Sequence, residues 1–187
     1  LVEETTFLLQ GPVFPSGAYA ADVEIERETG EVRVRRIVAV DDAGRVVNPL
    51  LAHGQVLGAT VQGLGQSLME EIVHDEAAQP MANSFLQYAM PSAMEIPPID
   101  AETIETRSPF NPLGAKGIGE GGAIGTPAAV ANAVCAALAP LGIRPPDLPF
   151  TPERVMSAIR AATHDHGIHR GEGAVSDADE DRSAGDQ

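Results

Sequence analysis

The chain has 187 residues, a hydrophobic content of 43% and a formal net charge of −15, so it has the size of one domain and enough apolar residues to bury a core. The negative charge argues against nucleic-acid and anionic-membrane partners, because phosphate binding needs clustered Lys or Arg. A single cysteine, Cys135, excludes an internal disulfide and a cysteine-clustered metal site, and without a membrane-spanning run or a secretion signal we expect a soluble, cytoplasmic protein.

A β-hairpin is predicted near the start of the chain. Residues 18–28 alternate apolar and polar side chains, as a half-buried strand does. Residues 28–31 read Glu-Thr-Gly-Glu and supply a turn, and the Val- and Ile-rich residues 32–40 form the returning strand.

A long helix is predicted from about Leu50 to Glu71. Asn48 is a good N-cap and Pro49 a good first helical residue. The helix contains four glycines, each costing about 1 kcal/mol relative to alanine: Gly54, Gly58, Gly63 and Gly65. One explanation is close packing of another element at Gly54 and Gly58. The other is that the helix turns three amide side chains toward a polar ligand, namely Gln55, Gln62 and Gln66.

The second half of the chain begins with a long connection, residues 79–107, that ends in an exposed strand at 103–106. Thr126 and Pro127 then predict a buried helix over 128–138, in which Cys135 reads as a small buried residue. Thr151 and Pro152 predict a short third helix to about Ala161. These elements indicate an α+β fold, with antiparallel strands packed against a long Gly-rich helix and two shorter helices.

The most informative segment is the glycine-dense loop that carries Glu120. Its glycines allow the main chain to approach a ligand closely: Gly114, Gly117, Gly119, Gly121, Gly122 and Gly125. Desolvation in such a loop would raise the pKa of Glu120 and make it a general base. The alternative is a glutamate that only meets the amides at the start of the next helix. Lys116, the only lysine, is either a charge partner of Glu120 or a surface residue.

Three motifs, in this order, resemble a known family. They occupy residues 40–49 (VDDAGRVVNP), 54–66 (GQVLGATVQGLGQ) and 111–122 (NPLGAKGIGEGG). Together they look like the C-terminal molybdenum-cofactor segment of the xanthine oxidase family large subunit, over about residues 15–160. Within that family, the GAKGIGEGG form is similar to aerobic carbon monoxide dehydrogenase large subunits and their relatives.

The resemblance implies specific roles. Glu120 matches the active-site glutamate beside molybdenum, which removes a proton as a hydroxyl attacks a small substrate, with water as the oxygen source. Gln55 matches a glutamine that contacts the pterin, and Gly119 lies in the same cofactor-binding loop. Three residues match the turn that approaches the phosphate or dinucleotide end: Asp42, Gly44 and Asn48. The implied cofactor is molybdenum–molybdopterin cytosine dinucleotide, with iron–sulfur and FAD carriers on partner subunits.

We therefore expect residues 1–162 to form the C-terminal part of a molybdenum-cofactor-binding domain and residues 163–187 to form a disordered acidic tail. We assign no metal to His164, His166 and His169 in this tail. Because Leu1 is not an initiator methionine, we expect a piece of a larger subunit, without turnover when isolated. Two alternatives remain: a non-catalytic cofactor-retention or subunit-assembly module, and an inactive truncated fragment.

Overall fold

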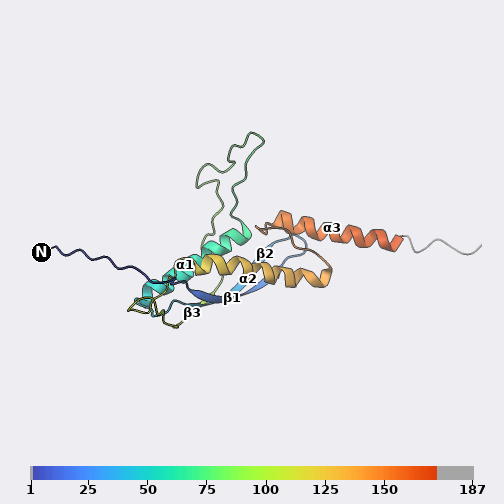
Figure 1. Cartoon of the computed structure of the whole chain (residues 1–187). Coiled ribbons are helices and arrows are strands. Elements are labelled where there is room, and N and C mark those ends of the chain that lie inside the picture. Colours follow the sequence, from blue (N-terminus) through green and yellow to red (C-terminus); the bar gives the residue numbers. More distant parts are fainter. Residues whose placement is uncertain (1, 172–187) are drawn as a thin grey trace, which may run out of the picture.

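The computed structural model describes residues 2–171 and contains a three-stranded sheet with helices packed against it (Figure 1). Strand β1 (Ser16–Ile25) pairs antiparallel with β2 (Val32–Asp42), which confirms the predicted hairpin. Strand β3 (Ile99–Ile104) pairs with the other edge of β2, and this pairing is parallel. The third strand therefore differs from an all-antiparallel arrangement, because the chain crosses over through a helix and a long connection before it returns to the sheet.

Helix α1 (Pro49–Leu68) begins where the sequence predicts. The side-chain oxygen of Asn48 accepts a hydrogen bond of 3.2 Å from the backbone N–H of Leu51, so Asn48 is the N-cap. Beyond α1 the chain projects from the molecule as a long arm before it enters β3 (Figure 1).

The glycines of α1 fall into two groups that the sequence did not separate. A Cβ at Gly63 would lie 2.8 Å from the Cβ of Thr126, and a Cβ at Gly65 would lie 1.9 Å from Oε1 of Glu70 and 2.9 Å from Cδ of Pro91. Gly54 and Gly58 have no neighbouring atom within 4 Å. The prediction of close packing at Gly54 and Gly58 is therefore wrong, and the close contact lies one to two turns farther along the helix.

Helix α2 (Gly121–Leu138) begins earlier than predicted, and a short 3₁₀ turn, η1 (Ala139–Leu141), follows it. Thr126 is a buried residue inside the helix rather than its cap, and Pro127 is also internal. The first turns are glycine-rich and form a helix because they pack tightly against α1 and β1, which outweighs their low intrinsic propensity. By length and composition alone, Gly121–Leu141 could cross a membrane, a test that core helices of soluble proteins also pass.

The hydrophobic core lies between the sheet and the helices. Its members come from β2, α1, α2, the segment between η1 and α3, and the first half of α3. The fully buried ones include Ile37, Leu64, Val130, Val134 and Val155. Helix α3 (Pro152–Gly171) continues well past the predicted end near Ala161. Cys135 is exposed on α2, so the expectation of a buried cysteine is wrong. Most of the predicted acidic tail, 163–187, lies outside the described residues.

Candidate functional site

The candidate residues gather where β2 ends, because the loop between β3 and α2 folds back over that end of the sheet. Asp42, the last residue of β2, is 4% exposed and holds this loop. Its Oδ2 accepts a 2.8 Å hydrogen bond from the Nζ of Lys116. Its Oδ1 accepts backbone hydrogen bonds of 2.9 Å from Gly44 and Thr106.

These contacts decide the charge of Asp42. Burial alone would raise the pKa of this carboxyl, but the hydrogen bonds from Lys116, Thr106 and Gly44 outweigh burial and hold the pKa well below its usual range. Lys116 is thus the partner of Asp42, with 16% of its side chain exposed. Both expectations for Lys116, a charge partner of Glu120 or a surface residue, are wrong.

Gly44 makes the second contact between the end of β2 and the loop. Its φ of +61° is a conformation that favours glycine. An added Cβ would lie 2.3 Å from the carbonyl oxygen of Gly114. The backbone N–H of Arg45 donates to that same carbonyl at 2.9 Å, and the N–H of Lys116 donates to Ala43 at 2.8 Å. Asp42 and Gly44 therefore anchor the loop that carries Glu120, whatever else they contact.

The other end of the loop is tied to α1 by Gln55. The side-chain Nε2 of Gln55 donates a 2.7 Å hydrogen bond to the carbonyl oxygen of Gly119. Two residues from separate motifs, predicted to lie at one site, are thus in direct contact. Gln62 and Gln66 are exposed on the same helix and make no side-chain hydrogen bond within residues 2–171.

Glu120 is exposed and occupies the N-cap position of α2. Its carbonyl oxygen accepts the first helical hydrogen bond, from the N–H of Ile124 at 3.1 Å, but its side chain makes no capping hydrogen bond. The interpretation of Glu120 as a helix-start glutamate that binds the amides is therefore wrong. In the part of the chain that the structure describes, its carboxylate has no hydrogen-bond or ion-pair partner.

Some glycines of the loop are required by the packing of α2. A Cβ at Gly122 would lie 2.5 Å from the backbone nitrogen of Thr60, and a Cβ at Gly125 would lie 2.2 Å from the ring of Tyr19. Those glycines allow α2 to pack. By contrast, Gly119 has no neighbour within 4 Å, and Gly117 has only ordinary contacts beginning at 3.7 Å.

The open glycines lie on the two segments that the Gln55 bond joins. Gly54 and Gly58 lie one turn apart on α1, next to Gln55, and Gly119 is its hydrogen-bond partner. Bare backbone on both segments leaves a shallow surface that side chains would otherwise fill. A flat, polar ring system fits such a surface, because it can approach the main chain and hydrogen-bond to the free amide oxygen of Gln55. The residues present therefore fit a pterin.

Two site residues were missed by sequence reasoning. Asp41 is 1% exposed, and its Oδ2 accepts a 2.6 Å hydrogen bond from the hydroxyl of Tyr19. Burial of Tyr19, then this hydrogen bond and the charge of Asp41, raise the pKa of Tyr19 above its usual value. The signal for Asp41 was its place beside Asp42 at the end of a predicted strand; no local signal connects it with Tyr19.

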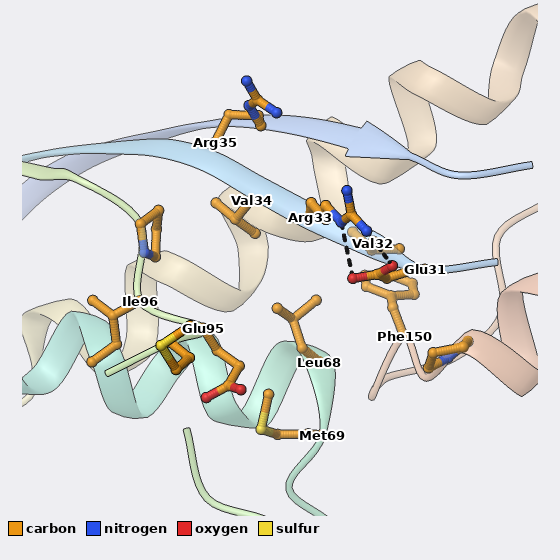
Figure 2. Close-up of a pocket in the computed structure, with 13 residues that line it drawn as sticks. Glu31, Val32, Arg33, Val34, Arg35, Leu68, Met69, Glu95, Ile96 and Phe150 are labelled. Carbon is orange, nitrogen blue, oxygen red and sulfur yellow. Dashed lines mark hydrogen bonds and ion pairs between the residues drawn. The ribbon is translucent and has the colours of Figure 1, made fainter. Parts of the chain in front are cut away.

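The hollow in Figure 2 lies at the other end of β2 and encloses about 520 Å³. The beginning of β2, the end of α1, residues 94–97 and Phe150 form its walls, and Arg33 pairs with Glu31 at its edge. No predicted site residue lines this hollow. The candidate site is instead an open surface, and residues 2–171 form one side of it.

Comparisons with known proteins identify the family of the chain. A family model described as molybdopterin cofactor-binding domain matches residues 3–97. The 6-hydroxypseudooxynicotine dehydrogenase complex subunit gamma of Paenarthrobacter nicotinovorans is 40% identical over 84% of this chain and 20% of its own length. The carbon monoxide dehydrogenase large chain of Hydrogenophaga pseudoflava is 33% identical over 79% of this chain and 18% of its own.

A solved structure shows the same fold. Quinoline 2-oxidoreductase from Pseudomonas putida 86 matches with a TM-score of 0.73 and 39% identity, over 76% of this chain and 18% of that one. The chain thus spans about a fifth of the length of the curated relatives it matches.

Proposed function

Because the chain belongs to the molybdopterin cofactor-binding domain family, we propose that it is the cofactor-binding segment of the large subunit of a molybdenum-dependent oxidoreductase that oxidises a small substrate with water as the oxygen source. The observation that carries this proposal is the bond between Gln55 and Gly119. This bond holds Gly119, the residue before Glu120, against the helix that carries the open glycines Gly54 and Gly58, which supports a role for Glu120 beside them.

Named residues of this chain would hold the cofactor. Gln55 would hydrogen-bond the pterin, and Gly54, Gly58 and Gly119 would let the ring approach the backbone. When bound, the molybdenum cofactor supplies two-electron redox chemistry and polarises the oxygen to be transferred. Asp42, Gly44 and Asn48 remain candidates for the phosphate or dinucleotide end. Asp42 and Gly44 would contribute to binding that end by anchoring the loop. Asn48 would contribute from the N-terminus of α1, which it caps.

Glu120 is the proposed general base. Its carboxylate is not used by the helix that follows, so it is available to accept a proton. The loop that presents it is fixed at one end by the Asp42–Lys116 pair and at the other by Gln55. These two anchors fix the backbone from which the Glu120 side chain extends, and a fixed backbone is one requirement for positioned proton transfer.

The remainder of the large subunit would cover much of the surface described here. Large apolar side chains are exposed along the N-terminal segment, on the arm and on α2, including Leu8 (80%), Phe14 (79%), Phe85 (86%), Leu86 (96%) and Ile124 (72%). Patches of this kind mark interaction surfaces. We propose that other parts of the subunit enclose Glu120, that the cofactor is the cytosine dinucleotide form, and that electrons leave through iron–sulfur and flavin subunits in the cytoplasm.

The test is a pair of isosteric substitutions in the complete large subunit with its cofactor. Glu120→Gln removes the proton acceptor at constant shape and should lower kcat by roughly 10²- to 10⁴-fold with molybdenum content unchanged. Glu28→Gln makes the same charge change in the hairpin turn at the far end of β2, and we expect it to leave both quantities unchanged. Retained activity in Glu120→Gln would remove Glu120 from the role of base.

The alternative is a non-catalytic module that only retains the cofactor or a partner subunit. It is favoured by the observation that Gln55 reaches the loop at Gly119 and that the open glycines need no contact with the Glu120 carboxylate. In that case Glu120→Gln would lower the molybdenum content and leave the rate per molybdenum unchanged.

A further inference from the structure

The two consecutive aspartates at the end of β2 lie against two different parts of the glycine loop. Asp42 binds Lys116, before Glu120 in the chain. Asp41 lies beside Gly121, immediately after Glu120: a Cβ added at Gly121 would lie 2.8 Å from Oδ1 of Asp41. Since successive residues of a strand point to opposite faces, adjacent carboxylates reach two different parts of the loop.

Tyr19 fixes the Asp41 side chain under the start of α2. Its hydroxyl donates the 2.6 Å hydrogen bond to Oδ2 of Asp41, which leaves Oδ1 toward Gly121. The ring of Tyr19 packs directly on the backbone of Gly125, one turn farther along α2. Strand β1, Asp41 and the first two turns of α2 therefore form one packed unit.

A carboxylate other than that of Glu120, that of Asp41, lies beside the start of α2. The N-terminus of a helix carries partial positive charge and is commonly stabilised by a carboxylate in its first turn. Helix α2 has no acidic residue in its first turn, and Glu120, at the N-cap, makes no side-chain hydrogen bond to the helix. The buried carboxylate of Asp41 lies where such a charge is needed.

We propose that Asp41, held by Tyr19, is a positioning residue for Glu120: it stabilises the start of α2 in place of Glu120 and so leaves the Glu120 carboxylate free to face the cofactor surface. This inference rests on the proposed role of Glu120 as base. Without the negative charge of Asp41, the carboxylate of Glu120 turns inward to bind the free amides of its own helix.

The test uses the complete large subunit with its cofactor and three variants. Asp41→Asn removes the charge at constant shape, and Tyr19→Phe removes the hydrogen bond while the ring still packs on Gly125. We expect both variants to speed amide hydrogen exchange in peptides covering residues 121–123 and to lower kcat. Asp41→Asn should change the exchange rate and kcat by roughly tenfold each, and Tyr19→Phe should change both by less. KM and molybdenum content should stay unchanged in both variants. Tyr88→Phe removes a comparable hydrogen bond, to Glu70 on the arm, and should change neither readout.

The possible outcomes are distinct. Unchanged exchange at 121–123 in both variants would overturn the inference, and so would faster exchange with kcat unchanged, because Asp41 would then only stabilise the helix. Either result, obtained while Glu120→Gln still abolishes activity, would leave the proposed function in place. Full activity in Glu120→Gln would instead overturn the proposed function itself.

Discussion

The side-chain nitrogen of Gln55 lies 2.7 Å from the carbonyl oxygen of Gly119 and donates a hydrogen bond to it. This bond joins α1 to the residue before Glu120, across 64 positions of sequence. The location of the proposed base therefore depends on α1 as well as on its own loop.

Substitution of Gln55 should separate its positioning role from its role in stability. The hydrogen bond is exposed, so Gln55→Ala should change the free energy of unfolding of the chain by no more than about 1 kcal/mol. In the complete subunit the same change should lower molybdenum content several-fold, because the pterin loses a polar contact and the loop loses an anchor. Metal analysis by mass spectrometry checks this, with Gln66→Ala on the same helix as control. Equal molybdenum contents in the two variants would contradict the proposed contact.

The glycines of α1 should respond in opposite directions to alanine. Gly58→Ala adds a methyl group in open space and should raise the free energy of unfolding by about 0.5–1 kcal/mol, since alanine is the better helix former. Gly63→Ala forces a methyl group against Thr126 and should lower the free energy of unfolding by about 1–3 kcal/mol. Urea unfolding measures both.

The stabilising change should nevertheless impair function. In the complete subunit we expect Gly58→Ala to reduce molybdenum content, because the added methyl group occupies the surface proposed for the pterin. Full cofactor loading in this variant would show that the ligand does not approach α1 at that turn.

Loss of Lys116 should be costly. Its pair with Asp42 is largely shielded from solvent, with side-chain exposures of 16% and 6%. Lys116→Met would leave the Asp42 carboxylate buried without its cation and should lower the free energy of unfolding by about 3 kcal/mol. The exposed pair of Arg33 and Glu31 is the control, and Arg33→Met should cost less than about 1 kcal/mol. Similar losses in both variants would mean that the Asp42–Lys116 pair is not specially protected.

Asp42 should also make stability depend on acid pH. Its folded-state pKa is depressed, so its charge stabilises the fold above the unfolded-state pKa, near about 4, and this contribution is lost as pH falls below that value. The difference in unfolding free energy between the wild-type chain and Asp42→Asn should therefore be largest near neutral pH and shrink below about pH 4. A difference that stays constant from pH 6 to about pH 3 would contradict a stabilising charge at Asp42.

The sequence predicted correctly those elements whose ends are set by residues adjacent in the chain. The hairpin follows from alternation and its turn, and the start of α1 follows from Asn48 and Pro49. The start of α2 could not be predicted in this way, because its glycines form a helix only through contacts with Thr60 on α1 and Tyr19 on β1.

The site was predictable only in part, because some of its contacts join residues that are far apart in the sequence. The motifs indicated Gln55, Gly119 and Glu120, and the structure brings Gln55 and Gly119 into contact. The partner of Lys116 lies 74 positions away in sequence, and charge spacing alone gave the wrong alternatives for it. The distinction between glycines that pack and glycines that stay open likewise depends on tertiary neighbours.

The most direct measurement is the location of molybdenum by anomalous diffraction in crystals of the complete, cofactor-loaded subunit. We expect the metal at the edge of the surface formed by Gly54, Gly58 and Gly119, with the carboxylate of Glu120 facing it. A metal found at the hollow beside Arg33 and Phe150, or a Glu120 side chain turned away toward solvent, would contradict the proposed site.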